Sequence, residues 1–134
     1  MFERIRYESL NSRQKENYNF QKVAGRLADY GYNCLRLNDD WQGADFLAVH
    51  VNGTNVLRVQ LKGRFTLDQK YRGRELHVAF ILGETCFVYP HDIVLSAVEE
   101  RGRIGQTVSW VERGNYSWPS LPTWASELLE PYRI

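Results

Sequence analysis

Two apolar runs joined by the dipeptide Asn52-Gly53 constrain the fold of this 134-residue chain more than any other feature. The runs occupy residues 44–49 and 57–61 and are rich in Val and Leu. Asn-Gly between such runs favours a β-hairpin with a two-residue type I′ turn, because both central residues of that turn need a positive φ. A turn of this kind sets the register of both strands.

The register predicted by this turn brings three polar side chains together at one end of the hairpin. Asp45 pairs with Gln60, and directly opposed Cβ atoms lie about 5 Å apart. Side chains alternate along a strand, so Lys62 emerges on the same face as Gln60, about 7 Å further on. A three-residue loop would move the pairing by one and place Leu61 opposite Asp45 instead.

The periodicity of the remaining sequence predicts an α/β domain over residues 1–134. A helix with an apolar stripe is capped by Asn11 or Ser12 and stopped by Gly31. A loop over 38–43 precedes the hairpin. The other elements are predicted as a helix over 13–30, strands at 34–37, 44–49, 57–61, 76–82 and 86–89, a helix from Pro90 to about 101, a strand at 107–111 and a short helix over 124–129. We expect a central mixed sheet flanked by helices.

Positive charge gathers in one segment although the formal net charge is only +1. Asp68 is the one acid in that segment among six basic residues: Arg58, Lys62, Arg64, Lys70, Arg72 and Arg74. A basic stripe of this kind can neutralise phosphates along a nucleic-acid backbone. A solvated loop whose charges only maintain solubility is the alternative.

The two cysteines and the short apolar runs argue against a disulfide-rich protein and against a membrane protein. No apolar run reaches signal-peptide or membrane-spanning length, so we expect a cytoplasmic protein without a membrane partner. Cys34 and Cys86 lie in predicted strands, which predicts buried thiols rather than a disulfide framework.

The three histidines do not predict a metal centre. His50 points to the face opposite Asp45 and lies about 17 Å along the strand from it. His77 begins an apolar strand and His91 follows Pro90, so both are expected to satisfy local hydrogen bonds. Without an HxH, HExxH or Cys/His cluster, the sequence does not support a zinc hydrolase.

An acid on one strand and an amide-x-lysine on the next suit phosphodiester hydrolysis with a divalent cation. Oxygen ligands hold Mg²⁺, which polarises the phosphate and activates a bound water, and a lysine can orient that water or stabilise developing charge. In these residues the chain resembles the PD-(D/E)xK nuclease superfamily. Ala44-Asp45 stands in place of Pro-Asp, and Gln60-Leu61-Lys62 stands in place of Glu-x-Lys.

The resemblance extends to small endonucleases of the Holliday-junction-resolvase type. The segments Gly-Tyr-Asn at 31–33 and Phe-Val-Tyr-Pro at 87–90 are similar to theirs. The similar part covers about 13–101 and leaves 102–134 as a C-terminal extension. It implies a restriction-endonuclease-like fold.

The same resemblance implies roles for the residues of the hairpin. Asp45, the Gln60 side-chain carbonyl and the Leu61 main-chain carbonyl would ligate Mg²⁺ or Mn²⁺, and Lys62 would position the attacking water. The implied partner is duplex or branched DNA, and a homodimer would allow both strands to be cut. Arg58, Arg64, Lys70, Arg72 and Arg74 would bind the nucleic acid.

Two positions depart from the pattern of the superfamily. Gln60 is neutral where relatives usually carry a carboxylate, and one charge at about 4 Å is worth on the order of 4 kcal/mol at an effective dielectric constant of about 20. We therefore expect weaker metal binding. Relatives often carry a Glu in the helix where this chain has Asn19-Phe20. Glu16 lies one turn before Phe20 and can substitute, or it is a surface charge.

Aromatic residues near the hairpin and in the tail leave alternatives open. Asp39 and Asp40 could add a metal ligand and Trp41 a stacking platform for a base, but turn capping and burial of the indole are the favoured interpretation. The tail aromatics are interpreted as packing or as an oligomer contact: Tyr116, Trp118 and Trp124.

Three functional hypotheses follow from these residues. The first is a metal-dependent DNA endonuclease. The second is a nuclease-fold module that has lost turnover and binds nucleic acid or a protein. The third is a structural domain in which Asp45 and Lys62 form a partly buried ion pair and the tail aromatics are exposed.

Overall fold

The N-terminal helix α1, Ser12–Ala28, begins where the sequence offers a reciprocal cap. Asn11 Oδ1 accepts a hydrogen bond from the Gln14 N–H at 2.8 Å, and Gln14 Oε1 accepts one from the Asn11 N–H at 2.9 Å. This capping box satisfies two main-chain donors at once. Gly31, with a φ of +87°, follows the helix and lets the chain turn into the sheet. The predicted helix and its cap are confirmed.

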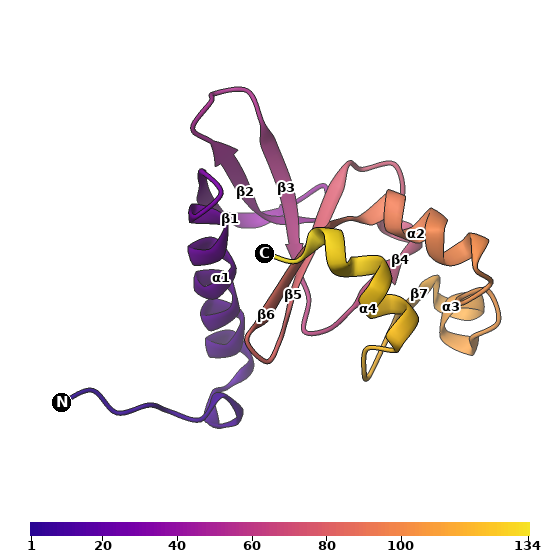
Figure 1. The fold of residues 1–134 in the computed structure, drawn as a ribbon, viewed down its shortest axis with the longest axis horizontal. Helices are drawn as coiled ribbons and strands as arrows, with labels where there is room; N and C mark the ends of the chain where they lie inside the picture. Colours follow the sequence, from indigo (N-terminus) through magenta and orange to yellow (C-terminus); the bar gives the residue numbers. More distant parts are fainter.

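Five strands form the central sheet of the computed structural model, which describes residues 1–134. The elements follow in the order η1 (Tyr7–Ser9), α1, β1 (Tyr32–Trp41), β2 (Ala44–His50), β3 (Val56–Leu61), β4 (Thr66–Asp68), η2 (Gln69–Tyr71), β5 (Leu76–Leu82), β6 (Thr85–Pro90), α2 (His91–Glu100), α3 (Val108–Arg113), β7 (Asn115–Ser117), α4 (Thr123–Leu129) and η3 (Glu130–Tyr132). The sheet order is β1-β2-β3-β5-β6, and only β3 and β5 pair in parallel (Figure 1). The predicted α/β class with a mixed sheet flanked by helices is confirmed.

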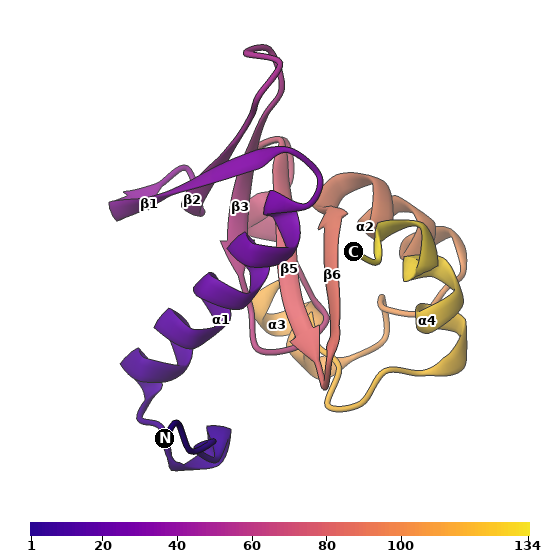
Figure 2. The same ribbon diagram turned by 60° about the vertical axis from the view of Figure 1, so that its left-hand side comes forward.

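Helices cover the two faces of the sheet, as the turned view shows (Figure 2). On one face, α1 buries Val23 and Leu27 against Phe46, Ala48 and Val59. On the other face a larger cluster of 17 buried residues joins the sheet to α2, α3 and α4. Fully burying an aliphatic or aromatic side chain contributes about 1.5–3 kcal/mol, so both layers stabilise the sheet that carries the hairpin.

The hairpin of β2 and β3 has the predicted register. Phe46 pairs with Val59 and Val49 pairs with Val56, and continuing the same register places Asp45 opposite Gln60. The predicted loop was wrong, however. The main-chain N–H of His50 donates to the Asn55 carbonyl at 2.9 Å, and this pair encloses a loop of four residues, 51–54, between β2 and β3. A two-residue loop and a four-residue loop with the same centre give the same strand pairing. The predicted register is therefore correct although the predicted loop length was not.

The type I′ geometry expected at residues 52 and 53 occurs at Gln42-Gly43. Both residues have a positive φ, of 56° and 90°, whereas only Gly53 is positive in the other turn. Trp41 and Ala44 pair across this turn, so β1 continues to Trp41. The predicted loop over 38–43 was therefore wrong. Gly43 is required there, because a Cβ on it would lie 2.8 Å from Leu76 Cδ1.

The strand predicted at 107–111 is the helix α3. Thr107 Oγ1 accepts a hydrogen bond from the Trp110 N–H at 3.1 Å, and Gly114 ends the helix in the left-handed conformation. The alternation that suggested a strand does not mark a buried face, because Val108 and Val111 are 68% and 70% exposed. Thr107 and Gly114 are typical capping residues for the start and the end of a helix, and they outweigh the alternation between them.

The basic segment is ordered rather than a solvated loop. It contains β4, which pairs with β7 of the tail in a second, two-stranded sheet. Phe65, Leu67 and Tyr71 in this segment are buried in the larger cluster. The segment is therefore held against the sheet, and its charges have defined positions.

The C-terminal residues are integrated into the same core. Trp118 is 7% exposed and its ring stacks on Phe65 at 4.5 Å between centroids, with Tyr116 and Trp124 packed edge-on against it. Packing of the tail aromatics is confirmed. Cys86 is buried and Cys34 half-buried, both as free thiols.

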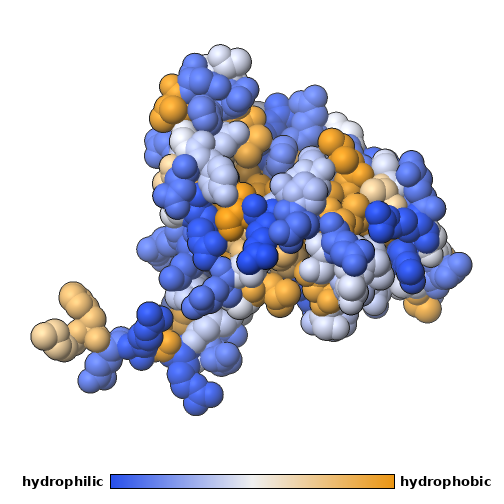
Figure 3. All heavy atoms as spheres, viewed as in Figure 1, coloured by the Kyte–Doolittle hydropathy of each residue, from blue (hydrophilic) through white to orange (hydrophobic).

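The N-terminal arm of residues 1–10 stands away from this body beside α1 (Figure 1). Apolar and polar residues alternate along it (Figure 3), and Met1 and Phe2 are fully exposed. None of the helices is long and apolar enough to cross a membrane.

Candidate active site

One amide group links the side chain of Asp45 to the end of β3. Gln60 Nε2 donates hydrogen bonds to Asp45 Oδ2 at 2.9 Å and to the Leu61 carbonyl at 3.2 Å. The Leu61 N–H also donates to Asp45 Oδ2, at 2.8 Å. The hairpin register thus brings Asp45, Gln60 and Leu61 together as the sequence predicts.

The environment of Asp45 disfavours its negative charge. Burial raises the pKa of this carboxyl above its ordinary value of 3.8, and the Glu16 and Asp40 carboxylates raise it further. The Leu61 N–H and the Lys62 ammonium act in the opposite direction without reversing the shift. Gathered carboxylates of this kind are stabilised by a bound cation. Glu16 lines the same hollow as Asp45, and its role as the helix acid stays a prediction.

Asp45 stands where two hollows of the surface meet. One hollow, of about 190 Å³, is mainly acidic and is lined by residues of α1, β1, β2 and β3: Glu16, Arg36, Leu37, Asn38, Asp39, Asp40, Asp45 and Leu61. The other, of about 320 Å³, is mainly basic on its far side and is lined by Asp40, Gly43, Asp45, Gln60, Lys62, Lys70, Tyr71 and Arg74. The two share Asp40 and Asp45.

A third hollow, of about 820 Å³, extends the acidic one along the start of α1. It shares Glu16 and Arg36 with the acidic hollow and adds Arg13. The three hollows adjoin through shared lining residues, and we call them together the polar groove: Asp40 and Asp45 join the acidic and basic hollows, and Glu16 and Arg36 join the acidic and third hollows.

Lys62 borders the basic hollow from the end of β3. Its main-chain N–H donates to the Ala79 carbonyl of β5 at 2.9 Å, which fixes the backbone. Its Nζ lies 5.7 Å from the centroid of the Tyr71 ring, and Lys70 Nζ lies 5.4 Å from the same centroid. Lys62 makes no ion pair with Asp45; the four ion pairs of the chain lie elsewhere. The hypothesis of a structural Asp45–Lys62 pair was wrong.

The basic residues predicted to bind nucleic acid divide into three groups. Lys70 and Arg74 line the basic hollow next to Asp45. Arg58 lies over the Trp41 ring, with its guanidinium carbon 4.8 Å from the centroid. Arg64 borders a separate apolar hollow, and Arg72 makes a two-pronged contact with Glu99 of α2, at 3.0 and 3.4 Å. Only part of the predicted stripe therefore faces the site.

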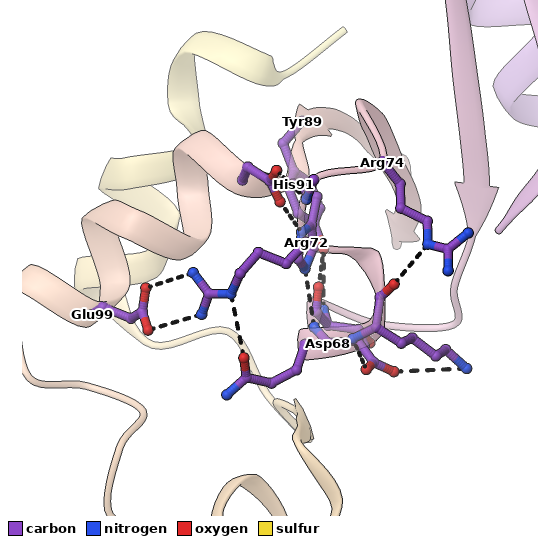
Figure 4. A network of polar contacts seen from close by, with 11 residues as sticks. Asp68, Arg72, Arg74, Tyr89, His91 and Glu99 are labelled. Atoms are coloured by element: carbon purple, nitrogen blue, oxygen red, sulfur yellow. Dashed lines mark hydrogen bonds and ion pairs between the residues drawn. The ribbon is translucent and has the colours of Figure 1, made fainter. Parts of the chain in front are cut away.

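A buried polar network positions the segment that carries Lys70 and Arg74 (Figure 4). His91 Nε2 accepts a hydrogen bond from the Asp68 N–H at 3.0 Å, and Tyr89 Oη bonds to the main chain of Thr66. Burial lowers the pKa of His91 despite the opposing hydrogen bond with Asp92, so the ring is neutral and can accept. The prediction that His91 serves local hydrogen bonding is confirmed.

Trp41 was predicted to be buried, and the structure corrects this. The residue is 47% exposed. Sequence reasoning also missed Tyr71, Arg13 and Arg36, which line the groove. Only the folded structure brings these residues to the site. Arg13 belongs to α1 and Arg36 to β1, and no local sequence pattern relates them to the hairpin.

The oxygen donors at Asp45 fit a divalent cation of the magnesium type. Asp45 Oδ1 accepts no hydrogen bond, so one oxygen is available. The Gln60 amide nitrogen already lies between Asp45 Oδ2 and the Leu61 carbonyl, and a half-turn of the amide replaces it with an oxygen. No three His, Cys, Asp or Glu side chains group closely enough to enclose a cation, so amide and main-chain oxygens must complete the set.

Comparison with solved structures finds a structural similarity, whereas two other comparisons find none. No family model matches the chain, and no curated protein matches it. Among solved structures, a bacterial homing endonuclease is similar with a TM-score of 0.48 and 21% sequence identity. The similar part covers 64% of this chain and 70% of the endonuclease chain. The function proposed next rests on the residues of this chain.

Proposed function

We propose that the protein is a divalent-metal-dependent DNA endonuclease. The observation that carries this proposal is the groove centred on Asp45, in which carboxylates in the middle are flanked by basic residues on both sides. A hydrolase acting on a phosphodiester needs a cation at the cut phosphate and positive charge at the phosphates beside it.

The residues of the groove divide this work. Asp45, the Leu61 carbonyl and the amide of Gln60 would hold Mg²⁺ or Mn²⁺, with Glu16 and Asp40 adding negative charge. The bound cation would polarise the phosphate and activate a water molecule. Lys62 would orient that water and balance charge on the phosphate, because its backbone is fixed to β5.

Positive charge outside the centre would align the DNA backbone. Lys70 and Arg74 lie on one side of Asp45, and Arg13 and Arg36 lie on the other. Each phosphate that such a residue neutralises adds to affinity and to its salt dependence. Because the groove crosses a single centre, cutting both strands of a duplex requires a second copy, and we propose a homodimer.

A second candidate function is a nucleic-acid-binding module without turnover. The observation in its favour is the amide of Gln60, whose nitrogen is hydrogen-bonded to two of the oxygens that a cation would need. Displacing these hydrogen bonds costs part of the free energy of metal binding. The groove and its basic residues are the same in both candidates.

One assay separates the two candidates. Supercoiled plasmid and a branched oligonucleotide are incubated with the protein in Mg²⁺, in Mn²⁺ and in EDTA, and each reaction is analysed for cut and for shifted DNA. The endonuclease produces nicked or linear plasmid in a metal and none in EDTA. A shift without cutting in either metal supports the binding module and refutes the endonuclease.

A further inference from the structure

Trp41 forms an exposed aromatic platform and directly follows Asp40, which lines the basic hollow. It is 47% exposed, whereas Trp110 and Trp118 are 8% and 7% exposed. Its neighbours Asp40 and Gly43 both line the hollow that contains Asp45. Arg58 covers one face of this indole, and the exposed remainder is available to a ligand with a flat ring of its own.

The platform is held in place by the basic residues around it. The Arg58 guanidinium lies over the ring at 4.8 Å, and an Arg58 N–H donates to the Arg74 carbonyl at 3.4 Å. Arg74 in turn donates to Gln42 Oε1 at 2.7 Å, which fixes the turn next to Trp41. A fixed aromatic ring loses little conformational freedom on binding, so stacking on it contributes more of its energy to affinity.

We propose that Trp41, supported by Arg58, stacks on an unpaired nucleobase next to the phosphate that enters the groove. A base inside a duplex has neighbours on both faces, so an indole can stack only on a base that is single-stranded, flipped or at a branch. The preferred substrate class is then DNA with unpaired nucleotides beside the cut position. This inference rests on the proposed function and adds the substrate class to it.

The position of Arg58 favours a role in base stacking rather than a role limited to binding phosphate. Arg58 and Gln60 are alternate residues of β3 and share a face, so the platform adjoins the Asp45 centre. A phosphate bound by Lys70 and Arg74 places its own nucleotide at the rim where the indole lies. Arg behind the ring increases its affinity for a π-face through cation–π contact.

The test compares three fluorescent ligands of equal length in EDTA at constant salt: single-stranded DNA, blunt duplex DNA, and a single strand whose central residues lack bases. Binding is followed by anisotropy. We expect Trp41→Ala to weaken binding of the single strand by about 5- to 150-fold, the range for one stacked base. Binding of the duplex and of the abasic strand should change by less than about twofold.

Two variants control the experiment. Trp41→Phe keeps an aromatic face and should restore a part of the single-strand affinity. Tyr30→Ala removes another exposed aromatic, 54% exposed, which lies just beyond α1 and lines none of these hollows. It should change none of the three affinities. Melting curves of each variant confirm that the protein is folded.

The outcomes distinguish this inference from the proposed function. If Trp41→Ala weakens all three ligands alike, or none, stacking is refuted while phosphate binding in the groove stands. If the wild type binds none of the three ligands at low salt, both proposals are refuted. A loss confined to the single strand with bases supports stacking.

Discussion

Gln60 Nε2 lies 2.9 Å from Asp45 Oδ2, across the two antiparallel strands of the hairpin. The contact means that the position facing the acid holds an amide, and that the nitrogen of this amide donates a hydrogen bond to the acid. A carboxylate at position 60 would repel Asp45 when no cation is bound. We therefore expect the amide to stabilise the protein without metal and to weaken the metal binding that we propose.

Asp45→Asn should stabilise the protein at neutral pH while removing cleavage. The pKa of Asp45 is raised above 3.8, first by burial, so its contribution to stability is complete below about that pH and is lost as the pH rises through the folded-state pKa. Asn can accept the same hydrogen bonds without the charge. Melting temperatures from pH 3 to pH 8 should show a gain at pH 7 that disappears at the acid end. Equal melting temperatures at pH 7 would contradict the raised pKa.

Gln60→Glu should lower the melting temperature of the metal-free protein and increase its affinity for metal. The added charge faces Asp45 and removes the amide N–H, so the melting temperature without metal should fall. Binding of Mn²⁺ should tighten by about tenfold or more, since about 1.4 kcal/mol suffices for a factor of ten. Calorimetric titration with Mn²⁺ measures the change, and Gln60→Ala is the matched control, which should bind more weakly than the wild type. Unchanged affinity in Gln60→Glu would place the cation elsewhere.

Lys62→Ala should lower the rate of cleavage and leave the protein folded. The ammonium is partly exposed above Tyr71 and forms no ion pair, so its loss leaves no buried charge unpaired. Removing one group that stabilises developing charge costs about 100- to 1,000-fold in rate. Single-turnover cleavage at saturating protein isolates this rate. A variant with the wild-type rate would exclude Lys62 from the reaction.

His91→Gln should reduce the loss in free energy of unfolding that accompanies a fall in pH. The pKa of His91 is lowered from 6.5 by burial, so its contribution to stability is present above pH 6.5 and is lost as the pH falls below that value. The groups that face the ring are Asp92, Asp68 and Arg72. Free energies of unfolding from urea denaturation should fall between pH 6.5 and 5 in the wild type. The fall should be smaller in the variant, and an identical fall in both would contradict the assignment.

Lys70→Gln and Arg72→Gln form a pair that separates groove charges from structural ones. Lys70 lines the basic hollow with its side chain 68% exposed and makes only a long ion pair of 3.8 Å with Asp68, whereas Arg72 is bound to Glu99 at 3.0 Å. Loss of one phosphate contact should reduce the slope of log affinity against log salt by about 0.9. We expect that reduction for Lys70→Gln and a smaller one for Arg72→Gln. Equal reductions would mean that Arg72 leaves Glu99 to bind DNA.

The hairpin could be predicted because its determinants are local. Alternation and a turn signal fix which residues face one another, and the pairing of Asp45 with Gln60 depends only on an even number of loop residues. The loop itself was mispredicted because Asn52 uses its side chain to accept from the N–H groups of Thr54 and Asn55. An Asn that bonds in this way does not need the positive φ of a type I′ turn.

The groove could not be predicted, and the exposure of Trp41 was mispredicted, because their determinants are distant in sequence. Gln42 adopts a positive φ where the adjoining Gly43 packs closely against Leu76, and this turn leaves Trp41 at the surface. The basic stripe was misjudged for the same reason. The partner of Arg72, Glu99, lies 27 positions further along the chain.

Cleavage by the wild type and by Asp45→Asn, compared side by side, tests the central claim most directly. Both proteins are incubated with plasmid and branched DNA in Mg²⁺ and in Mn²⁺, after melting curves show that both are folded. We predict metal-dependent cutting by the wild type and none by Asp45→Asn, with DNA binding in EDTA retained by both. Equal cutting by the two proteins, or no cutting by the wild type in either metal, would contradict an endonuclease centred on Asp45.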